Sequence, residues 1–567
     1  MNKLYLLLFI FIYATTYSQQ AMPIQSPMPW YHATSIYQIY PRSFNDSNGD
    51  GIGDIQGIIQ KLDYIQSLGY GAIWCSPFFK SPQQDFGYDI SDYTDIAPEY
   101  GTMADVEQLI AEVHKRGMKM VFDMVMNHTS VQHTWFKESS SSKTNEKADW
   151  YIWRDKPNNW KSMTGGSGWH YVKERNQYYW ASFLPFQPDL NYRNPAVKDT
   201  MLNTVRFWLK KGVDGFRLDI FNVIYKDAEF RNNPHSSKAI PTETDPSGFF
   251  QKAIYNLNRP ESKQFAKELR AVCNEYGEKI LLGEVSGNHS TIRDFMGTDK
   301  NDGLGLVFNF EMLAFKFKAS YFYKLVSGVE ADFTEPFTPV YCFSNHDRRR
   351  SIKRINNDVR KAKLLQLFQL TVRGVPCMYY GEEIGMTDGR IKFKDALDPI
   401  PRKYKIPRFL VDMSGETLNR DEVRTPMQWD STAYAGFTTD RAKPWLPVNP
   451  DYKTVNVANE EADSNSLLNH LRRILAVRNK QMPLTHGSIE LVDAHQLPKN
   501  VLGYSRSYKG EKVWVFINMG KHQQLLNVSV GENGLLYSCE DYMQTSEGKL
   551  ILLPYSGVIT TTARFDK

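Results

Sequence analysis

The feature that most constrains the fold of this 567-residue chain is an alternation of short apolar runs with amphipathic helices. Each run is rich in β-branched and aromatic residues and ends in polar or acidic ones, as expected of a strand buried on both faces. Eight strand–helix repeats favour a closed (β/α)8 barrel over the alternative, an open doubly wound sheet. The runs lie at 35–44, 72–78, 118–128, 215–220, 279–285, 305–312, 339–347 and 376–385.

The segment between the second and third runs shows how clear the helical pattern is. Thr102 and Asp105 have the spacing of a capping box, an apolar face begins at Val106, and Gly117 follows the last periodic residue. We therefore expect one helix here, with its apolar face on the barrel.

The spacing of the runs also divides the chain. Residues 30–127 form the first part of the barrel, and the aromatic-rich stretch 128–192 is too long for a loop, so we expect a small inserted domain. The barrel continues over 193–484 with an insertion at about 386–450. Paired short strands at 501–508 and 513–519 predict a C-terminal antiparallel β-sandwich over 485–567.

The N-terminus predicts export. Lys3 precedes an apolar run at 4–14, which is too short for the roughly 20 residues of a membrane span. Residues 1–20 therefore resemble a secretory signal peptide, and we expect a periplasmic or secreted protein with no stable membrane insertion.

Composition excludes several classes of protein. Lys plus Arg (68) exceed Asp plus Glu (63) by 5, which is close to neutral at this length, so no nucleic-acid partner is expected. The five cysteines are odd in number and contain no C-x-x-C pair, which favours buried thiols over disulfides or zinc. We expect a monomer without an organic cofactor.

Acidic residues end several of the predicted strands. Asp219, Glu284 and Asp347 follow the fourth, fifth and seventh runs. The carboxyl ends of barrel strands meet at one mouth, so the three side chains should converge. A single Asp after a strand is usually a helix cap, but three carboxylates on one rim are hard to explain by capping.

Such a set suits the cleavage of a glycosidic bond. One carboxylate attacks or stabilises the anomeric carbon, and a second carboxylic acid protonates the leaving oxygen. Arg217, two residues before Asp219, should share its face and keep it ionised. Glu284 needs the opposite, a raised pKa.

These motifs resemble the α-amylase superfamily, glycoside hydrolase family thirteen, and within it the oligo-1,6-glucosidase and α-glucosidase subgroup. The resemblance covers nearly all of the chain after the leader. The segments that carry it are 123–128, 215–219, 283–285, 344–347 and 187–191.

The resemblance implies a role for each acid. Asp219 would be the nucleophile of a retaining reaction, Glu284 the general acid/base, and Asp347 the stabiliser of the bound ring. His128 and His346 would hydrogen-bond the sugar in the first subsite.

The resemblance also implies a closed first subsite. Asp85 would pair with Arg424 to cap the non-reducing end of the glucose, Tyr88 would stack under the ring, and Arg217 would orient Asp219. A capped subsite implies exo-action on a short α-gluco-oligosaccharide. The alternatives, a core tyrosine and a surface ion pair, stay open for Tyr88 and for the Asp85 pair.

A structural Ca²⁺ site is a further expectation. Side-chain oxygens recur at Asp46, Asn48, Asp50 and Asp54, and the Ile52 carbonyl could fill the gap. Clustered hard oxygens suit Ca²⁺, and relatives of this subgroup bind the ion on this loop. The alternative is an acidic surface turn.

Substrate preference depends on few residues. The bulky Ile220 after the nucleophile slightly favours α-1,6 over α-1,4 links, and Met163 stands near a position where relatives commonly carry Phe. We expect a retaining exo-acting α-glucosidase. The alternatives are a glucosyl-transferring relative, such as a sucrose isomerase or sucrose hydrolase, and a non-catalytic ectodomain like those of transporter heavy chains.

Overall fold

The structure is a computed structural model that describes residues 28–403, 417–439, 441–531, 533–540, 543–544 and 548–565. The predicted signal peptide at 1–20 lies outside these residues.

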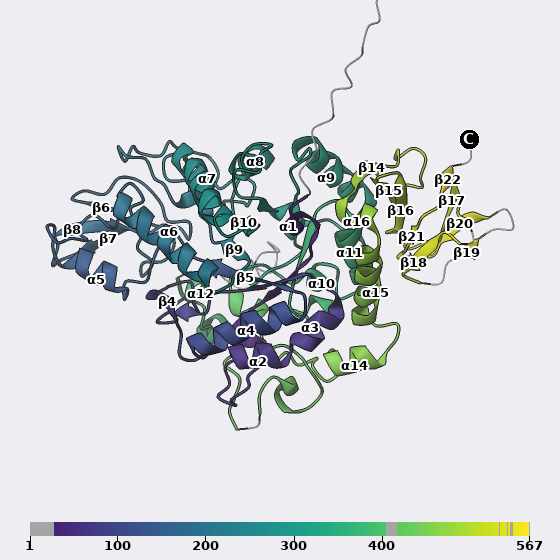
Figure 1. The fold of residues 1–567 in the computed structure, drawn as a ribbon, viewed down its shortest axis with the longest axis horizontal. Coiled ribbons are helices and arrows are strands. Elements are labelled where there is room, and N and C mark those ends of the chain that lie inside the picture. Colours follow the sequence, from purple (N-terminus) through teal and green to yellow (C-terminus); the bar gives the residue numbers. More distant parts are fainter. Residues whose placement is uncertain are drawn as a thin grey trace, which may run out of the picture.

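A closed barrel of eight parallel strands occupies the centre of the molecule (Figure 1). The order around the barrel is β1-β13-β12-β11-β10-β9-β5-β2, and every predicted run overlaps one of these strands. The predicted (β/α)8 barrel is thereby confirmed. The strands are β1 Ile36–Ile39, β2 Ala72–Cys75, β5 Lys119–Met124, β9 Gly215–Leu218, β10 Ile280–Gly283, β11 Leu306–Asn309, β12 Val340–Tyr341 and β13 Val375–Tyr379.

Helices cover the outside of the barrel. α4 shows why they form where they do: Thr102 and Asp105 make a capping box, and Val106 and Val113 are among the residues that α4 buries. The helices that alternate with the strands are α2 Ile55–Gln60, α3 Leu62–Leu68, α4 Met103–Lys115, α6 Pro195–Lys210, α7 Pro260–Asn274, α8 His289–Met296, α9 Ala319–Asp332, α10 Ser351–Arg354, α11 Val359–Thr371 and α15 Leu467–Lys480.

The barrel interior is a packed apolar core at the amino-terminal ends of the strands. Ile36, Val121, Ile280 and Val375 are fully buried there, and Tyr31 of α1 (Trp30–Ala33) packs against the same cluster. Polar side chains gather at the other end, beyond the carboxyl ends of the strands, which is where barrel enzymes place their chemistry.

The predicted inserted domain follows β5. It contains α5 (Thr134–Ser141) and a three-stranded antiparallel sheet with the order β6-β8-β7. These strands are β6 Trp153–Arg154, β7 Trp169–Val172 and β8 Gln177–Trp180. A two-stranded ribbon, β3 (Phe79–Lys80) and β4 (Asp92–Ile96), follows β2.

The predicted C-terminal sandwich is also confirmed, at the opposite end of the molecule from the inserted domain (Figure 1). Its hairpin turns at Lys509 and Gly510, both with positive φ, as a two-residue hairpin turn requires. The five-stranded sheet contains β14 Ser488–Leu491, β15 Val501–Tyr508, β16 Glu511–Asn518, β21 Ser556–Thr560 and β18 Leu535–Ser538. The four-stranded sheet contains β19 Met543–Gln544, β20 Lys549–Leu552, β17 Gln524–Ser529 and β22 Arg564–Phe565.

A buried arginine joins the sandwich to the barrel, and a second buried arginine bonds the same part of the barrel. Arg506 of β15 donates to the carbonyl of Thr371 at 2.8 Å, and Arg478 of α15 donates to the carbonyls of Leu370 (2.8 Å) and Gly374 (3.0 Å). Burial lowers the pKa of Arg506 to about 9 and that of Arg478 to about 10. Both cations are thus held by backbone carbonyls at the end of α11.

The connection from β13 to α15 holds two short helices, α12 (Pro399–Lys403) and α14 (Val457–Ala462), and α16 (Met482–His486) leads into the sandwich. All five cysteines are free and buried, as predicted. Among the helices that the structure describes, none combines the length and apolar character needed to cross a bilayer.

Candidate active site

The three predicted acids lie at one end of the barrel. Asp219 follows β9, Glu284 follows β10, and Asp347 lies beyond β12. Backbone hydrogen bonds continue past the strand ends, from Glu284 N to Leu218 O (2.9 Å) and from Asp219 N to Met124 O (3.2 Å). The barrel hydrogen-bond pattern therefore positions Asp219 and Glu284.

Arg217 holds two of the acids together. Its guanidinium bonds Asp219 Oδ1 at 2.8 Å, both oxygens of Asp123 at 2.9 and 3.0 Å, and Glu284 Oε2. Arg217 is 2% exposed and lies 5.1 Å from the ring of Trp74. Two carboxyls on one guanidinium are compatible with the spacing of about 5–5.5 Å that a retaining glycosidase needs.

A chain of hydrogen bonds joins the third acid to this centre. The Tyr88 hydroxyl donates to Asp123 at 3.0 Å and lies 2.6 Å from His346 Nε2, which in turn lies 3.1 Å from Asp347 Oδ2. The rings of Tyr88 and His346 are parallel, 5.3 Å apart. Gln38 Nε2 lies 2.9 Å from His346 Nδ1, so Nδ1 accepts and Nε2 carries the proton.

The carboxyl groups differ in their electrostatics. Burial raises the pKa of Glu284 to about 8, although Arg217 opposes this rise. Burial also raises the pKa of Asp219 to about 7, against the opposing charge of Arg217. Burial opposes ionisation of Asp347 too, but His346, Arg424 and Arg420 hold its pKa well below the usual range.

These directions bear on two expectations. Glu284 has the raised pKa that a general acid needs. At Asp219 the guanidinium of Arg217 lowers the pKa, as expected, while burial raises it by more. Because both carboxyls bond one guanidinium, they titrate as a pair.

The predicted pair of Asp85 with Arg424 is wrong. Asp85 Oδ1 pairs with Arg420 at 2.6 Å, whereas Arg424 reaches Asp347 Oδ1 at 2.8 Å and the carbonyl of His346 at 2.9 Å. Arg420 and Arg424 lie at the start and the C-cap of one short 3-10 helix. Sequence spacing could not decide which of the two reaches Asp85.

Sequence reasoning also missed residues of this network. Arg420 bonds the fully buried Asp398 at 2.9 Å, in a segment whose sequence carried no recognised motif. Asp123 was quoted only as part of a motif, yet it lies opposite Arg217 in the register of β5 and β9. A charged residue inside an otherwise apolar strand was the signal that could have revealed Asp123.

His128 lies on the inserted-domain side of the mouth. It is 2% exposed, its Nε2 lies 3.0 Å from the carbonyl of Tyr88, and its ring centroid is 5.8 Å from that of Phe183. Phe183 therefore supplies an aromatic ring beside His128, and the partly buried Met163 packs in the same cluster as Phe183. Nearby, the fully buried Asp189 pairs with Lys226 at 2.5 Å.

A partly exposed ion pair lies near Glu284. Glu243 pairs with Arg348, the residue after Asp347, and its carbonyl accepts from Gly287 N at 2.8 Å. Both side chains of this pair are partly exposed. Ile220, the residue after Asp219, has a φ of +33°, which is strained for a β-branched residue.

The loop predicted to bind Ca²⁺ is stabilised by its own hydrogen bonds. Asp46 Oδ1 accepts from Asn48 N at 3.1 Å, Asn48 Oδ1 from Asp50 N at 2.9 Å, and Asp50 Oδ1 from Ile52 N at 2.8 Å. Asp54 caps α2. Within the described ranges, no three Asp, Glu, His or Cys side chains are grouped so that they could hold a metal ion. The Ca²⁺ site stays a prediction.

Comparison with known proteins decides the family. Residues 38–487 match the model of the α-amylase catalytic domain. The chain belongs to the α-amylase family. Its acids converge as this glycoside hydrolase family requires, which leaves the non-catalytic alternative without support.

Several members of the α-amylase family are similar over most of their length. A probable α-glucosidase of Rhizobium meliloti is 41% identical over 86% of this chain and 89% of its own. An oligo-1,6-glucosidase of Parageobacillus thermoglucosidasius is 37% identical, with 87% and 91% covered.

Solved structures of the family also match. An α-glucosyl transfer enzyme, XgtA, superposes with a TM-score of 0.84 and 36% identity, covering 94% of this chain and 99% of its own. The trehalulose synthase MutB from Pseudomonas mesoacidophila MX-45 gives 0.83 and 32%, with 94% and 100% covered.

Proposed function

We propose that this enzyme is a retaining, exo-acting α-glucosidase that releases terminal α-linked glucose from short oligosaccharides. The observation that carries the proposal is the single guanidinium of Arg217, which bonds both Asp219 and Glu284. The similarity to proteins named α-glucosidase and oligo-1,6-glucosidase supports the substrate class.

The proposed reaction has two steps. Glu284 gives its proton to the glycosidic oxygen while Asp219 attacks the anomeric carbon, so the aglycone leaves and a covalent glucosyl ester forms. Glu284, now a carboxylate, takes a proton from water, whose oxygen attacks the anomeric carbon and releases glucose and Asp219. Arg217 offsets the negative charge that moves between the two groups.

The network around Arg420 supports exo-action. Asp85, Asp398 and Asp347 are all within ion-pair distance of this guanidinium, at 2.6, 2.9 and 3.5 Å. Such side chains would close the end of the first subsite and leave room for one terminal ring.

Comparing wild type with Asp219→Asn tests the function. We expect glucose release from isomaltose and maltose to fall by on the order of 10³–10⁵-fold, because the amide is no longer a nucleophile. The matched control is Asp245→Asn, at a half-exposed carboxylate that pairs with Lys238. Equal activity in wild type and Asp219→Asn would end the proposal.

For the linkage we propose a preference for α-1,6 over α-1,4 bonds, supported by Ile220. Removing one carbon in Ile220→Val should lower the ratio of kcat/KM for isomaltose to that for maltose by about tenfold. An unchanged ratio would remove Ile220 as the determinant of linkage.

Glucosyl transfer is a second candidate function. It is favoured by the similarity to XgtA and to the trehalulose synthase MutB, both at TM-scores above 0.8. The two functions share the covalent intermediate and differ in whether water or a sugar receives the glucosyl group. Product analysis at high sucrose and high maltose separates them, since hydrolysis yields free monosaccharides and transfer yields new glucosides.

We also propose that the loop 46–54 binds a structural Ca²⁺, on the strength of its all-oxygen donor set. If so, Ca²⁺ should raise the Tm of wild type and EDTA should lower it, while Asp50→Ala should abolish the difference. A Tm that does not respond to Ca²⁺ in wild type contradicts this site.

Export and oligomeric state complete the proposal. The basic and apolar leader supports secretion, with the leader removed. We propose that the secreted enzyme is a monomer. N-terminal sequencing of the mature protein and light scattering of the purified enzyme test these two points.

A further inference from the structure

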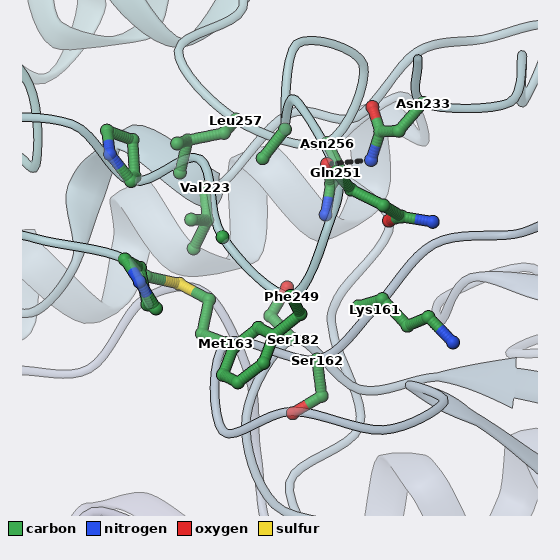
Figure 2. A pocket seen from close by; sticks show the side chains of 14 residues that line it. Lys161, Ser162, Met163, Ser182, Val223, Asn233, Phe249, Gln251, Asn256 and Leu257 are labelled. Carbon is green, nitrogen blue, oxygen red and sulfur yellow. Dashed lines mark hydrogen bonds between the residues drawn. The ribbon is translucent and has the colours of Figure 1, made fainter. Parts of the chain in front are cut away.

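A second pocket lies between the inserted domain and the segment that follows β9, and none of the three acids lines it (Figure 2). One wall comes from the inserted domain, with Lys161 and Met163, and the other from residues 223–257. Among the described residues, no carboxylate lines it. A ligand in this pocket would therefore be bound without a carboxylate.

The pocket presents one unused hydrogen-bond donor. The side-chain Oδ1 of Asn233 accepts from Tyr255 N at 3.1 Å, so the side-chain Nδ2 of Asn233 faces Asn256 and donates to the Asn256 Oδ1 at 2.8 Å. This bond fixes the Asn256 amide with its Nδ2 toward the interior of the pocket, as Figure 2 shows. Asn256 is 6% exposed, and its Nδ2 has no hydrogen-bond partner among the described residues. This nitrogen is accessible from the pocket and free to donate to a ligand there.

An acceptor and an apolar surface complete the pocket. Gln251 donates its Nε2 to the Asn159 carbonyl at 2.5 Å, which leaves its Oε1 as an acceptor. Val223 and Leu257 supply apolar wall and pack in one cluster with Ile220, the residue after Asp219.

The backbone is strained to form the remaining wall. Phe249 and Phe250 both have positive φ, +50° and +64°, which is unfavourable for aromatic residues. Hydrogen bonds from Phe249 N to Ala239 O and from Phe250 N to Lys238 O hold this conformation. The result is that Phe249 lines the pocket while Phe250 is 56% exposed.

We propose that this pocket is a second sugar site, which binds a neutral monosaccharide. The apolar wall would take the C–H face of the ring, while Asn256 Nδ2 and Gln251 Oε1 bond its hydroxyl groups. That the ligand is the glucose released by the enzyme rests on the proposed function. Its occupation would bridge the inserted domain and the segment that carries Ile220.

The test counts bound sugar. A deoxyfluoroglucose is titrated into the enzyme, and its bound states are resolved by ¹⁹F NMR. We expect two bound signals in wild type, one in the catalytic mouth and one in the pocket. Ala253→Phe, which fills the pocket from its lining, should lose one of them. Ile254→Phe is the matched control, because Ile254 is 48% exposed and does not line the pocket, and it should keep both.

Asn256→Asp is a milder second variant. It keeps the oxygen that accepts from Asn233 and removes the free donor, so it should weaken the pocket signal severalfold and leave the other unchanged. Equal numbers of bound signals in wild type and Ala253→Phe overturn the proposal, as does unchanged affinity in Asn256→Asp. If the catalytic mouth binds no glucose, wild type shows one signal and Ala253→Phe none. The pocket then stands while the glucosidase proposal falls.

Discussion

The two sides of the catalytic mouth are built differently. On the side of Asp347, Arg420 and Arg424 are 12% and 0% exposed and pair with Asp398, Asp85 and Asp347. On the side beyond Glu284, the contact between Glu243 and Arg348 is 25% and 31% exposed. The first side is a network of two guanidiniums and three carboxylates in which only Asp347 is partly exposed, and on the second side both members of the ion pair are partly exposed.

The difference indicates how specificity is divided. Buried charges must be fully paired, so the Arg420 side tolerates little change and is suited to a constant group, the terminal glucose. Solvent reaches both side chains of the Glu243 pair and weakens their attraction, so this side can vary with the aglycone or acceptor.

The sharpest way to break this comparison is to remove the acid between the two sides. Glu284→Gln should reduce kcat/KM on isomaltose by about 10²–10⁴-fold, because the poor leaving group needs its proton. Aryl glucosides with good leaving groups should lose far less. Steady-state kinetics on both substrates check this, and equal losses would contradict the acid role.

Removing Arg420 tests the buried side. Arg420→Met leaves Asp398 and Asp85 as buried carboxylates without their cation, which should lower the free energy of unfolding by about 3–5 kcal/mol. Urea denaturation measures the change. The matched control is Arg360→Met, whose side chain is 56% exposed and pairs with Asp358 at 3.6 Å. A loss no greater than that of the control would show that the network is dispensable.

The pH profile sharpens the assignment of the two acids. Activity needs Asp219 ionised and Glu284 protonated, so kcat/KM should fall below pH of about 7 as the pKa of Asp219 is passed, and above about 8 as that of Glu284 is passed. Each limb should approach a tenfold fall per pH unit. On aryl glucosides the alkaline limb should weaken, and a profile identical to that on isomaltose would count against Glu284.

The smallest effect is expected on the exposed side. Glu243→Gln should change the ratio of transfer to hydrolysis by about two- to fivefold, in line with the 0–1 kcal/mol of an exposed pair. Hydrolysis of a small aryl glucoside should stay near wild type. Asp245→Asn, in the same segment but paired with Lys238, is the control. A loss with Glu243→Gln as large as that with Arg420→Met would erase the distinction between the sides.

Sequence reasoning was strongest where a pattern is local. The capping box of α4, the hairpin at Lys509 and Gly510, and the strands that end in Asp219 and Glu284 each follow from spacing along the chain. The capping box and the hairpin are set by hydrogen bonds within a few residues, and the strands are marked by short apolar runs, so all of these can be read without the tertiary fold.

Sequence reasoning was weakest where residues far apart in the chain pair with each other across the fold. Asp85 and Arg420 are 335 positions apart, and Arg424 four residues later is an equally good cation. Which of the two reaches Asp85 depends on how the segment after β13 packs against the mouth. The ionisation of Asp219 likewise depends on burial by the whole site, which no motif encodes.

The arginines at the seam of the sandwich have a consequence for engineering. Arg506 belongs to the terminal domain, but Thr371, whose carbonyl it bonds, belongs to the barrel. A shortened enzyme that stops before the sandwich would leave Thr371 without this donor and expose apolar surface of α11 to water. The last 80 or so residues therefore cannot be treated as a removable tail, and a fusion partner is better attached at the extreme C-terminus than in place of this domain.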